Sequence, residues 1–524
     1  MRAFSSQGVD TGCAGESMSG MKLRERCERL PAIVCLALYT VVVLRCAWLS
    51  DDAYITFRTI DNFLSGYGLT WNPDERVQAY THPLWLLLLT PIQAVTGEPH
   101  LTTITVSVLL SVGAVLLCAF ALSATPLAAT LGVLVFTLSR AFVDYSTSGL
   151  ENPLSHLLLA GYLIVWIRRP ASDRSFLLLA TLAGLTTLNR MDLALVVLPG
   201  VLVWAWQRRG VRTLGLLLLG FAPFILWELW SLFYYGFPFP NTAYAKLNTQ
   251  IPAAMLVRQG WFYFADSLTT DPLTPIMIVA GLLAPIVVGR RRHLPIVVGV
   301  CLYLAYVLRI GGDFMAGRFL SVPLFCAVIL LVSSPVARSA RALVPLFGLI
   351  LLTGLVATRP SLLSDERYGM DFYYMGPHDI ADERAAYYQA TGLLRILRGR
   401  PVPDHAWARE GKAARLAGPG VVVSRNIGFF GLAAGPRVHI VDEDGLADPL
   451  LARIRYAPGS TWRVGHFHRP IPTGYIETLR DGANVIADPQ LARRYDLLAR
   501  ITRGPLLDSE RLRDILRMNL GFSK

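Results

Sequence analysis

Long apolar runs separated by short polar segments dominate the first two thirds of the chain. Eleven runs are long enough, or nearly so, to cross a bilayer as helices. They occupy residues 32–49, 101–121, 125–139, 152–167, 175–188, 191–206, 212–233, 274–289, 294–309, 318–335 and 342–358. A further run, 83–96, follows Thr81-His82-Pro83 and is too short to span, which favours an interfacial or re-entrant helix. The pattern predicts a polytopic α-helical membrane protein with about eleven spans.

Beyond residue 358 the pattern changes to the charged mixture of a soluble domain. Residues 420–424 and 437–442 are typical of strands, and residues 426–434 of a helix start. These features predict a small α/β domain. We therefore expect three parts: a cytoplasmic N-terminal segment (1–31), a transmembrane domain (32–358) and a soluble extracytoplasmic α/β domain (359–524).

Composition and charge agree with a membrane protein. The chain is 53% hydrophobic and 16% charged, with a mean hydropathy of +0.45, which excludes a single soluble domain. The net charge of +12 could suggest nucleic acid, but many Lys and Arg residues form short clusters between apolar runs. These clusters lie at 22–29, 168–174, 208–212, 290–292 and 338–341. The seven cysteines show no metal-ligand spacing, which favours core packing.

The positive-inside rule places all five clusters in the cytoplasm if the run 83–96 stays at the surface. Counting that run as a span would put Arg168 and Arg169 outside. We therefore expect a multi-pass protein of the plasma (inner) membrane. Its outward-facing parts are then loops 50–100, 140–151, 189–191, 234–273 and 310–317, together with the tail.

These outward loops contain nearly all the candidate chemistry. Asp51 and Asp52 follow the first span, and two adjacent carboxylates at a membrane edge should raise at least one pKa. A carboxylate with a raised pKa can act as general base towards a sugar hydroxyl. The alternative is a pair of solvated acids, or a cap on the following helix.

Charged residues at two further junctions are candidates for binding a phosphate. Arg190 could hold an anionic lipid phosphate while Asp192 orients it, or the two could form a structural ion pair. Asp313 and Arg318 flank a Gly-rich turn that could bind phosphate or sugar hydroxyls, or could simply connect two spans. Glu151 and Lys246 are isolated charged residues, and each is a weaker candidate for binding substrate.

Several familiar chemistries are missing from the sequence. There is no Walker loop, dinucleotide fingerprint, His-Glu-x-x-His or Cys-x-x-Cys motif, so an enzyme of this sequence needs neither ATP nor a nicotinamide at its site. Paired acids could hold a divalent cation, but a mechanism with a single base needs none. We expect no cofactor and no metal.

The motifs of the outward loops resemble the GT-C superfamily of polyprenyl-phosphate-sugar glycosyltransferases. Within it, the chain looks similar to terminal β-arabinofuranosyltransferases and to homologues named flagellar motor control proteins. The resemblance rests on Asp51 to Arg58, Gly66 to Pro73, Tyr80 to Trp85, Ser148 to Glu151, Tyr235 to Thr242, Gly311 to Leu320, Gly445 to Pro449 and Trp462 to His466. It extends over almost the whole chain.

The resemblance implies a GT-C-like membrane domain that transfers a sugar, arabinofuranose among the candidates, from a polyprenyl monophosphate to a cell-envelope glycan. Asp52 or Asp51 would be the catalytic base, and Asp52 is preferred because it lies further from the span. The candidate substrate and phosphate ligands are Arg58, His82, Glu151, Arg190, Asp192, Asn241, Lys246, Asp313 and Arg318. The expected partners are the lipid-linked donor, a glycan acceptor and the bilayer, with no nucleic acid.

Two other classes of function stay open. A transporter would place ionisable groups near the membrane midplane and often has paired halves. In this sequence the acids gather at one membrane edge. A non-catalytic membrane scaffold of the motor-control type would tolerate neutralisation of those acids.

Overall fold

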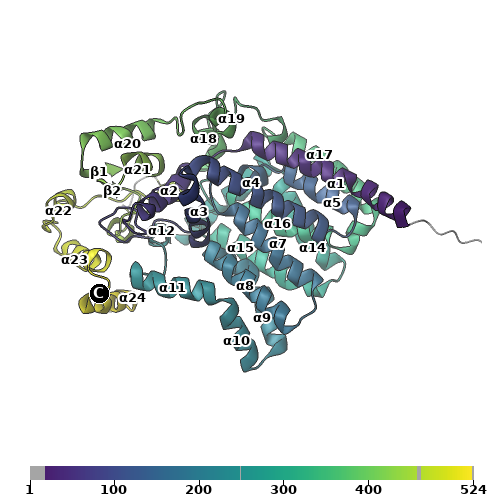
Figure 1. Ribbon diagram of the computed structural model, residues 1–524, viewed down its shortest axis with the longest axis horizontal. Helices are drawn as coiled ribbons and strands as arrows, with labels where there is room; N and C mark the ends of the chain where they lie inside the picture. Colours follow the sequence, from purple (N-terminus) through teal and green to yellow (C-terminus); the bar gives the residue numbers. More distant parts are fainter. Residues whose placement is uncertain (1–17, 248, 457–461, 522–524) are drawn as a thin grey trace, which may run out of the picture.

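The computed structural model describes residues 18–247, 249–456 and 462–521, with only the backbone for 18–27. Residues 1–17 of the predicted N-terminal segment therefore lie outside the described residues. Each predicted span coincides with one or two helices (Figure 1). They are α1 (Met18–Cys46), α4 (Pro99–Leu117), α5 (Pro126–Leu138), α7 (Asn152–Arg168), α8 (Asp173–Asn189), α9 (Ala194–Arg208), α10 (Val211–Gly220) with α11 (Ala222–Tyr234), α14 (Leu273–Val287), α15 (Leu294–Arg309), α16 (Ser321–Val332) and α17 (Ala340–Val356).

Helix length limits how many of these segments can cross a bilayer unbroken. Within the described residues, four helices are long and apolar enough, or six segments if each of two bent pairs counts as one span. The bent pairs are α10 with α11, at 62°, and α13 (Ala253–Thr270) with α14, at 105°. Other apolar helices, such as α5, α16 and α17, have fewer than eighteen residues. The protein is thus multi-pass, and the count of about eleven spans stays a prediction.

The run 212–233, expected as one span, is broken at Phe221. Pro223 lies in the first turn of α11 and has no N–H to continue the hydrogen bonds of α10. Gly220 packs against α8 so closely that a Cβ there would lie 2.5 Å from the Ala180 Cβ. This contact fixes the end of α10 and lets α11 turn away from it.

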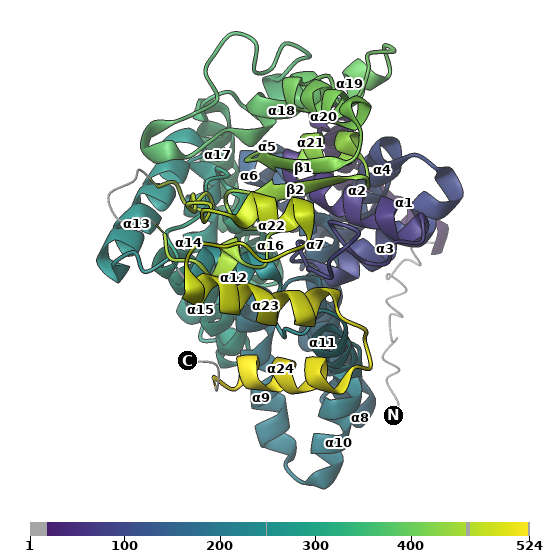
Figure 2. The ribbon, with the colours of Figure 1, turned by 90° about the vertical axis from the view of Figure 1, so that its left-hand side faces the viewer.

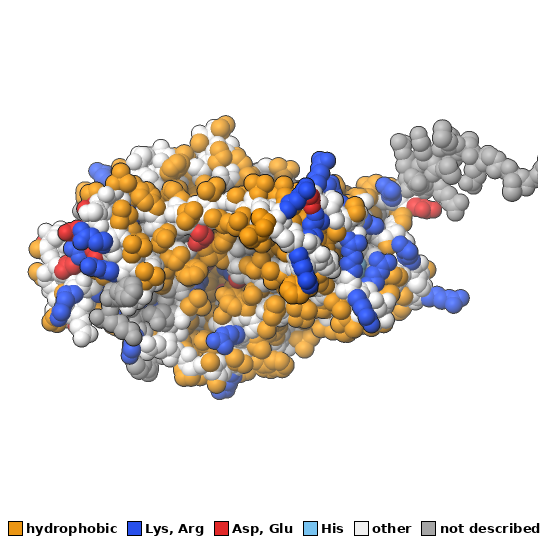
Figure 3. All heavy atoms as spheres, turned by 90° about the horizontal axis from the view of Figure 1, so that it is seen from below, with side chains coloured by type: hydrophobic (Ala, Val, Ile, Leu, Met, Phe, Trp, Pro, Cys, Tyr) orange, Lys and Arg blue, Asp and Glu red, His pale blue; other side chains and the backbone are white. Residues whose placement is uncertain are grey.

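The basic loops gather at one end of the helical module, which is the set of helices that form the predicted spans (32–358). The Arg168 side chain donates hydrogen bonds to the carbonyls of Ala121, Leu122 and Ser123, which follow α4. Arg292, between α14 and α15, donates to the carbonyls of Trp166 and Arg169. Hydrophobic side chains cover the middle of the face seen in Figure 3, and many Lys and Arg side chains gather towards its right-hand end.

The motif-bearing segments lie at the opposite end, together with the tail (Figures 1 and 2). This end contains α2 (Asp51–Leu64), α3 (Pro83–Thr96) and α12 (Asn241–Leu247). Ser50 caps α2 by accepting the backbone N–H of Ala53. The short helix predicted at 83–96 is confirmed with the same bounds.

The tail contains the predicted strands. β1 (Gly420–Ser424) and β2 (Val438–Asp442) pair in parallel, with Gly420 opposite Val438, and α21 (Gly428–Ala434) connects them. The other tail helices are α18 (Glu383–Thr391), α19 (Leu393–Ile396), α20 (Ala406–Ala417), α22 (Tyr475–Asp481), α23 (Pro489–Arg503) and α24 (Ser509–Asn519). That the tail is soluble and extracytoplasmic stays a prediction.

The tail shares its hydrophobic core with the loops at this end of the module. Ile55 of α2 and Trp71 pack in one buried cluster with Phe430 and Ile440 of the tail. Phe237, which precedes α12, packs in another cluster with Val441 and other tail residues. The tail therefore holds the loops at this end in place.

Candidate active site

A cavity of about 390 Å³ opens where the loops that contain α2 and α12 meet the spans and the tail. Its polar lining comes from segments far apart in the sequence. Its polar residues are Asp52, Thr56, Thr81, His82, Arg190, Asp192, Thr242, Lys246, Asp313 and Arg318. The tail contributes apolar residues and one glycine to the lining, namely Leu446, Val464, Gly465 and Phe467. The cavity therefore exists only when α2, α12, the Gly-rich turn and the tail are assembled.

The two adjacent acids of α2 have different surroundings. Asp52 lines the cavity, whereas Asp51 is buried against the tail. The Asp51 carboxylate accepts the backbone N–H groups of Gly428 (3.1 Å) and Phe429 (2.7 Å) at the start of α21. Burial, together with the charge of Asp52, raises the pKa of Asp51 to about 7 despite these two hydrogen bonds. Of the two candidate bases, only Asp52 faces the cavity.

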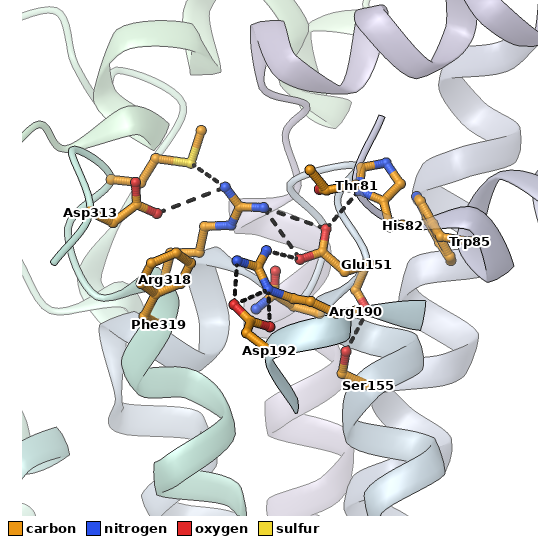
Figure 4. A network of polar contacts seen from close by, with 12 residues as sticks. Thr81, His82, Trp85, Glu151, Ser155, Arg190, Asp192, Asp313, Arg318 and Phe319 are labelled. Carbon is orange, nitrogen blue, oxygen red and sulfur yellow. Dashed lines mark hydrogen bonds and ion pairs between the residues drawn. The ribbon is translucent and has the colours of Figure 1, made fainter. Parts of the chain in front are cut away.

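Glu151 is the centre of a buried ionic network beside the cavity (Figure 4). Its Oε1 lies 2.6 Å from Arg190 and 3.3 Å from Arg318, and its Oε2 lies 3.1 Å from His82 Nδ1. Burial alone would raise the pKa of Glu151, but the guanidinium groups of Arg318 and Arg190 hold it well below its ordinary value. Glu151 is therefore ionised and orients three cavity residues without lining the cavity itself.

Arg190 and Asp192 form a bidentate ion pair. Arg190 Nε and a terminal nitrogen donate to the Asp192 carboxylate at 2.8 and 2.9 Å. The Arg190 guanidinium also lies over the Phe319 ring, 4.8 Å from its centroid. The structural ion pair considered from the sequence is thus present, and both partners line the cavity.

Arg318 and Lys246 bring positive charge to the cavity, and they differ in how closely carboxylates approach them. Arg318 is paired with Glu151 and lies 3.8 Å from the Asp313 carboxylate. Lys246 lies over the Phe314 ring, 5.9 Å from its centroid. No carboxylate among the described residues lies within 4.0 Å of its ammonium group. Lys246 is thus the cavity cation whose charge is least offset.

Arg58 and Asn241 lie outside the cavity and tie the loops to the tail. The Arg58 guanidinium donates to the carbonyls of Trp71, Gly431 and Val438, and burial lowers its pKa to about 9. The Asn241 amide donates to the carbonyls at 445, 446 and 448. Arg58 also donates to the Asn72 side chain, and the Asn241 carbonyl oxygen accepts from Arg453. These contacts occupy both side chains, so we assign both residues a role in assembly.

Sequence reasoning missed three threonines that line the cavity, Thr56, Thr81 and Thr242, and one buried acid beside it, Glu383. Thr56 lines the cavity one turn after Asp52, a position that helical spacing could have indicated. Glu383 begins α18 in the tail and is buried. Burial and the charges of Asp52 and Asp313 raise its pKa well above the ordinary value. Nothing in its local sequence marks Glu383, because the charged residues that surround it in the folded protein come from distant segments.

No group of three or more His, Cys, Asp or Glu side chains in the described ranges is placed to hold a metal ion. His82 contacts Glu151 and Thr56, and His466 packs edge-on against Phe314. The polar groups of the cavity are thus suited to charge pairing and hydrogen bonding.

Comparison with known proteins confirms the resemblance to terminal arabinofuranosyltransferases. The chain is 28% identical to a terminal beta-(1->2)-arabinofuranosyltransferase of Mycobacterium tuberculosis, over 82% of each chain. It is also 28% identical to the protein of that name from Corynebacterium glutamicum, over 80% of this chain and 72% of the relative. No protein-family model matches the chain.

Among solved structures, the chain has a loose likeness to ArnT from Cupriavidus metallidurans, which was crystallised bound to undecaprenyl phosphate. The TM-score is 0.48 and the sequence identity is 14%, over 83% of this chain and 88% of ArnT.

Proposed function

We propose that the chain is an integral membrane glycosyltransferase that moves arabinofuranose from a polyprenyl monophosphate to a cell-envelope glycan. The observation that carries this proposal is a single cavity lined by the Asp52 carboxylate and by three cationic side chains, Arg190, Lys246 and Arg318. The similarity to terminal beta-(1->2)-arabinofuranosyltransferases supports arabinofuranose as the sugar and a C2 hydroxyl as the attacking group.

In the proposed reaction the acceptor hydroxyl oxygen attacks the anomeric carbon of the donor. Asp52 takes the hydroxyl proton as the new bond forms, and the bond between the anomeric carbon and the phosphate oxygen breaks. The leaving polyprenyl phosphate keeps the electron pair and gains negative charge. Lys246 and Arg318 stabilise that charge, with Arg190 held in place by Asp192 and Glu151.

The apolar part of the cavity lining suits the lipid chain of such a donor. Leu195 of α9 and Tyr306 and Ile310 at the end of α15 line it on the side of the helical module. Leu247, at the end of α12, is 64% exposed at the rim. A polyprenyl chain could pass from the cavity into the bilayer along these residues while its phosphate stays beside Lys246.

The positive-inside rule supports an active centre on the outer face of the plasma membrane, because the cavity lies at the end opposite the basic loops. The donor carries its own leaving group, so the reaction as proposed uses no nucleotide, nicotinamide or metal ion at the site.

A transfer assay tests this function. Purified full-length protein in detergent micelles is supplied with polyprenyl-phosphate arabinofuranose and a synthetic arabinofuranose oligosaccharide. We expect the oligosaccharide to gain one pentose, and we expect no transfer from a nucleotide-linked arabinofuranose. Failure of the protein to use the lipid-linked donor, in micelles and in liposomes, would contradict the proposal.

A further inference from the structure

Thr56 has an unusual hydrogen bond for a threonine inside a helix. Helical threonines commonly donate their hydroxyl to the carbonyl four residues earlier. Thr59, on the same helix, does so with Ile55 at 3.1 Å. The Thr56 hydroxyl instead lies 2.9 Å from His82 Nε2, and Thr56 lines the cavity. A contact from outside the helix therefore sets the direction of this hydroxyl.

The partners of His82 determine which way the Thr56 hydrogen points. Glu151 is ionised and can only accept, so His82 Nδ1, 3.1 Å from Glu151 Oε2, carries the ring hydrogen. In the tautomer with its hydrogen on Nδ1, Nε2 is an acceptor, and the Thr56 hydroxyl donates to it. Thr56 consequently offers the cavity only the lone pairs of its oxygen.

Asp52 and Thr56 are four residues apart on α2, so their side chains lie on the same face of the helix. Both line the cavity, and both present hydrogen-bond acceptors to it. Two neighbouring acceptors match a substrate that carries two neighbouring hydroxyl donors. Lys246 and Arg318, which come from other segments of the lining, are suited to the phosphate of the donor.

We propose that Asp52 and Thr56 together bind two adjacent hydroxyls of the acceptor sugar, and that Glu151 and His82 are positioning residues that fix the Thr56 hydroxyl for this task. The inference rests on the proposed function, because the hydroxyl at Asp52 is then the attacking one. With attack from C2, the hydroxyl bound by Thr56 is the one at C3. The site would thus select acceptors with a free C2–C3 diol.

A cycle that combines a variant with an acceptor analogue tests this contact. In the transfer assay, Thr56→Val should raise the acceptor KM about tenfold and leave the donor KM within twofold, because one hydrogen bond to acceptor is lost. With a 3-deoxy acceptor, wild type and Thr56→Val should have the same acceptor KM. Thr56→Ser keeps the hydroxyl and should restore the wild-type KM. Thr59→Val is the matched control, since its hydroxyl is bound to backbone on the same helix.

Two substitutions of His82 separate its positioning role from simple packing. Gln places a polar group near the Nε2 position and can still receive the Thr56 hydroxyl, whereas Asn reaches only the Nδ1 position. We expect His82→Asn to raise the acceptor KM about tenfold and His82→Gln to raise it less than threefold. Acceptor binding without donor, measured by saturation-transfer NMR, should follow the same order.

Three results would overturn the inference: equal KM values for the two His82 variants, a Thr56→Val effect that persists with the 3-deoxy acceptor, or an effect confined to the donor KM. Each of them leaves wild-type transfer intact and so leaves the proposed function standing. A wild-type protein that transfers no sugar would instead overturn the proposed function, and with it this inference.

Discussion

One face of α2 contacts the tail and another faces the cavity, and each of these two faces carries an aspartate. On the tail face, Asp51 accepts two N–H groups at the start of α21, and Arg58 donates to the carbonyl of Gly431 within that helix and to that of Val438 at the start of β2. On the cavity face, Asp52 and Thr56 point into the open volume. Consecutive helical residues point about 100° apart, so two adjacent acids can have opposite surroundings.

The comparison shows what makes an acid available for chemistry. The hydrogen-bond acceptors of Asp51 are already occupied by backbone, and the tail leaves no room around it. A Cβ on Gly428 would lie 1.9 Å from the Asp51 carbonyl oxygen. Asp52 is the same type of residue but faces the cavity. Asp51 and Arg58 therefore fix the helix that presents Asp52.

Neutralising the two acids in turn should give the largest difference. We expect Asp52→Asn to reduce the transfer rate by roughly 10²- to 10⁴-fold, the usual contribution of a general base, without loss of folded protein. Asp51→Asn should retain the rate within about fivefold per folded molecule. Initial rates, together with size-exclusion profiles of both variants, measure this. Equal losses in the two variants would remove the distinction between the two faces.

Glu151→Gln tests the network that supports the cavity face. The change leaves Arg318 with only the 3.8 Å contact to Asp313, and breaking a buried ion pair typically costs about 3–5 kcal/mol. We expect a clear fall in the unfolding temperature in detergent and a loss of transfer. Glu410→Gln, at an exposed position of α20, is the control. An unchanged unfolding temperature in Glu151→Gln would show that the network is dispensable.

Lys246→Met tests the least compensated cation of the cavity. Loss of one charged contact to a phosphate should raise the donor KM about tenfold, while the acceptor KM stays within twofold. Lys246→Arg should recover most of the effect. The exposed Lys412→Met in α20 controls for net charge. A change confined to the acceptor KM would place the phosphate elsewhere.

The pH dependence of stability tests the tail face, with the smallest expected effect. The pKa of Asp51 is about 7 in the folded protein, against 3.8 for an ordinary aspartate. The folded state therefore binds this proton more tightly, so the stabilisation is complete below about pH 4 and is lost as the pH rises through 7.

Asp51→Asn should remove that dependence. From pH 4.5 to pH 8 the unfolding temperature of wild type should fall relative to that of Asp51→Asn, as measured by thermal unfolding in detergent. Asp61→Asn, an exposed change on the same helix, is the control. A constant difference between wild type and Asp51→Asn across this range would exclude the raised pKa.

Hydrophobic periodicity predicted most of the fold, because a span and a strand are each defined by local pattern. The helix at 83–96 and the strand at 420–424 have the predicted bounds. The break at Phe221 was missed because it depends on Pro223 and on the close approach of Gly220 to α8. Such contacts between helices leave little trace in an apolar run.

The candidate site was predicted in part. Adjacent charges near span ends pointed to Asp52, Arg190, Asp192, Asp313 and Arg318, and all of them line one cavity. Motif membership alone also selected Arg58 and Asn241, which bind the tail instead. Glu383 could not be found from its own segment, because its surroundings are created by the docking of the tail on α2.

The glycans of the cell envelope give the most direct test of the central claim that the Asp52 cavity transfers a lipid-linked sugar. Mass spectrometry of glycans from a strain lacking this protein should reveal the loss of terminal β-(1→2)-linked arabinofuranose. We expect wild type to restore that residue and an equally abundant Asp52→Asn variant not to restore it. An unchanged glycan in the deletion strain, or full restoration by Asp52→Asn, would contradict the claim.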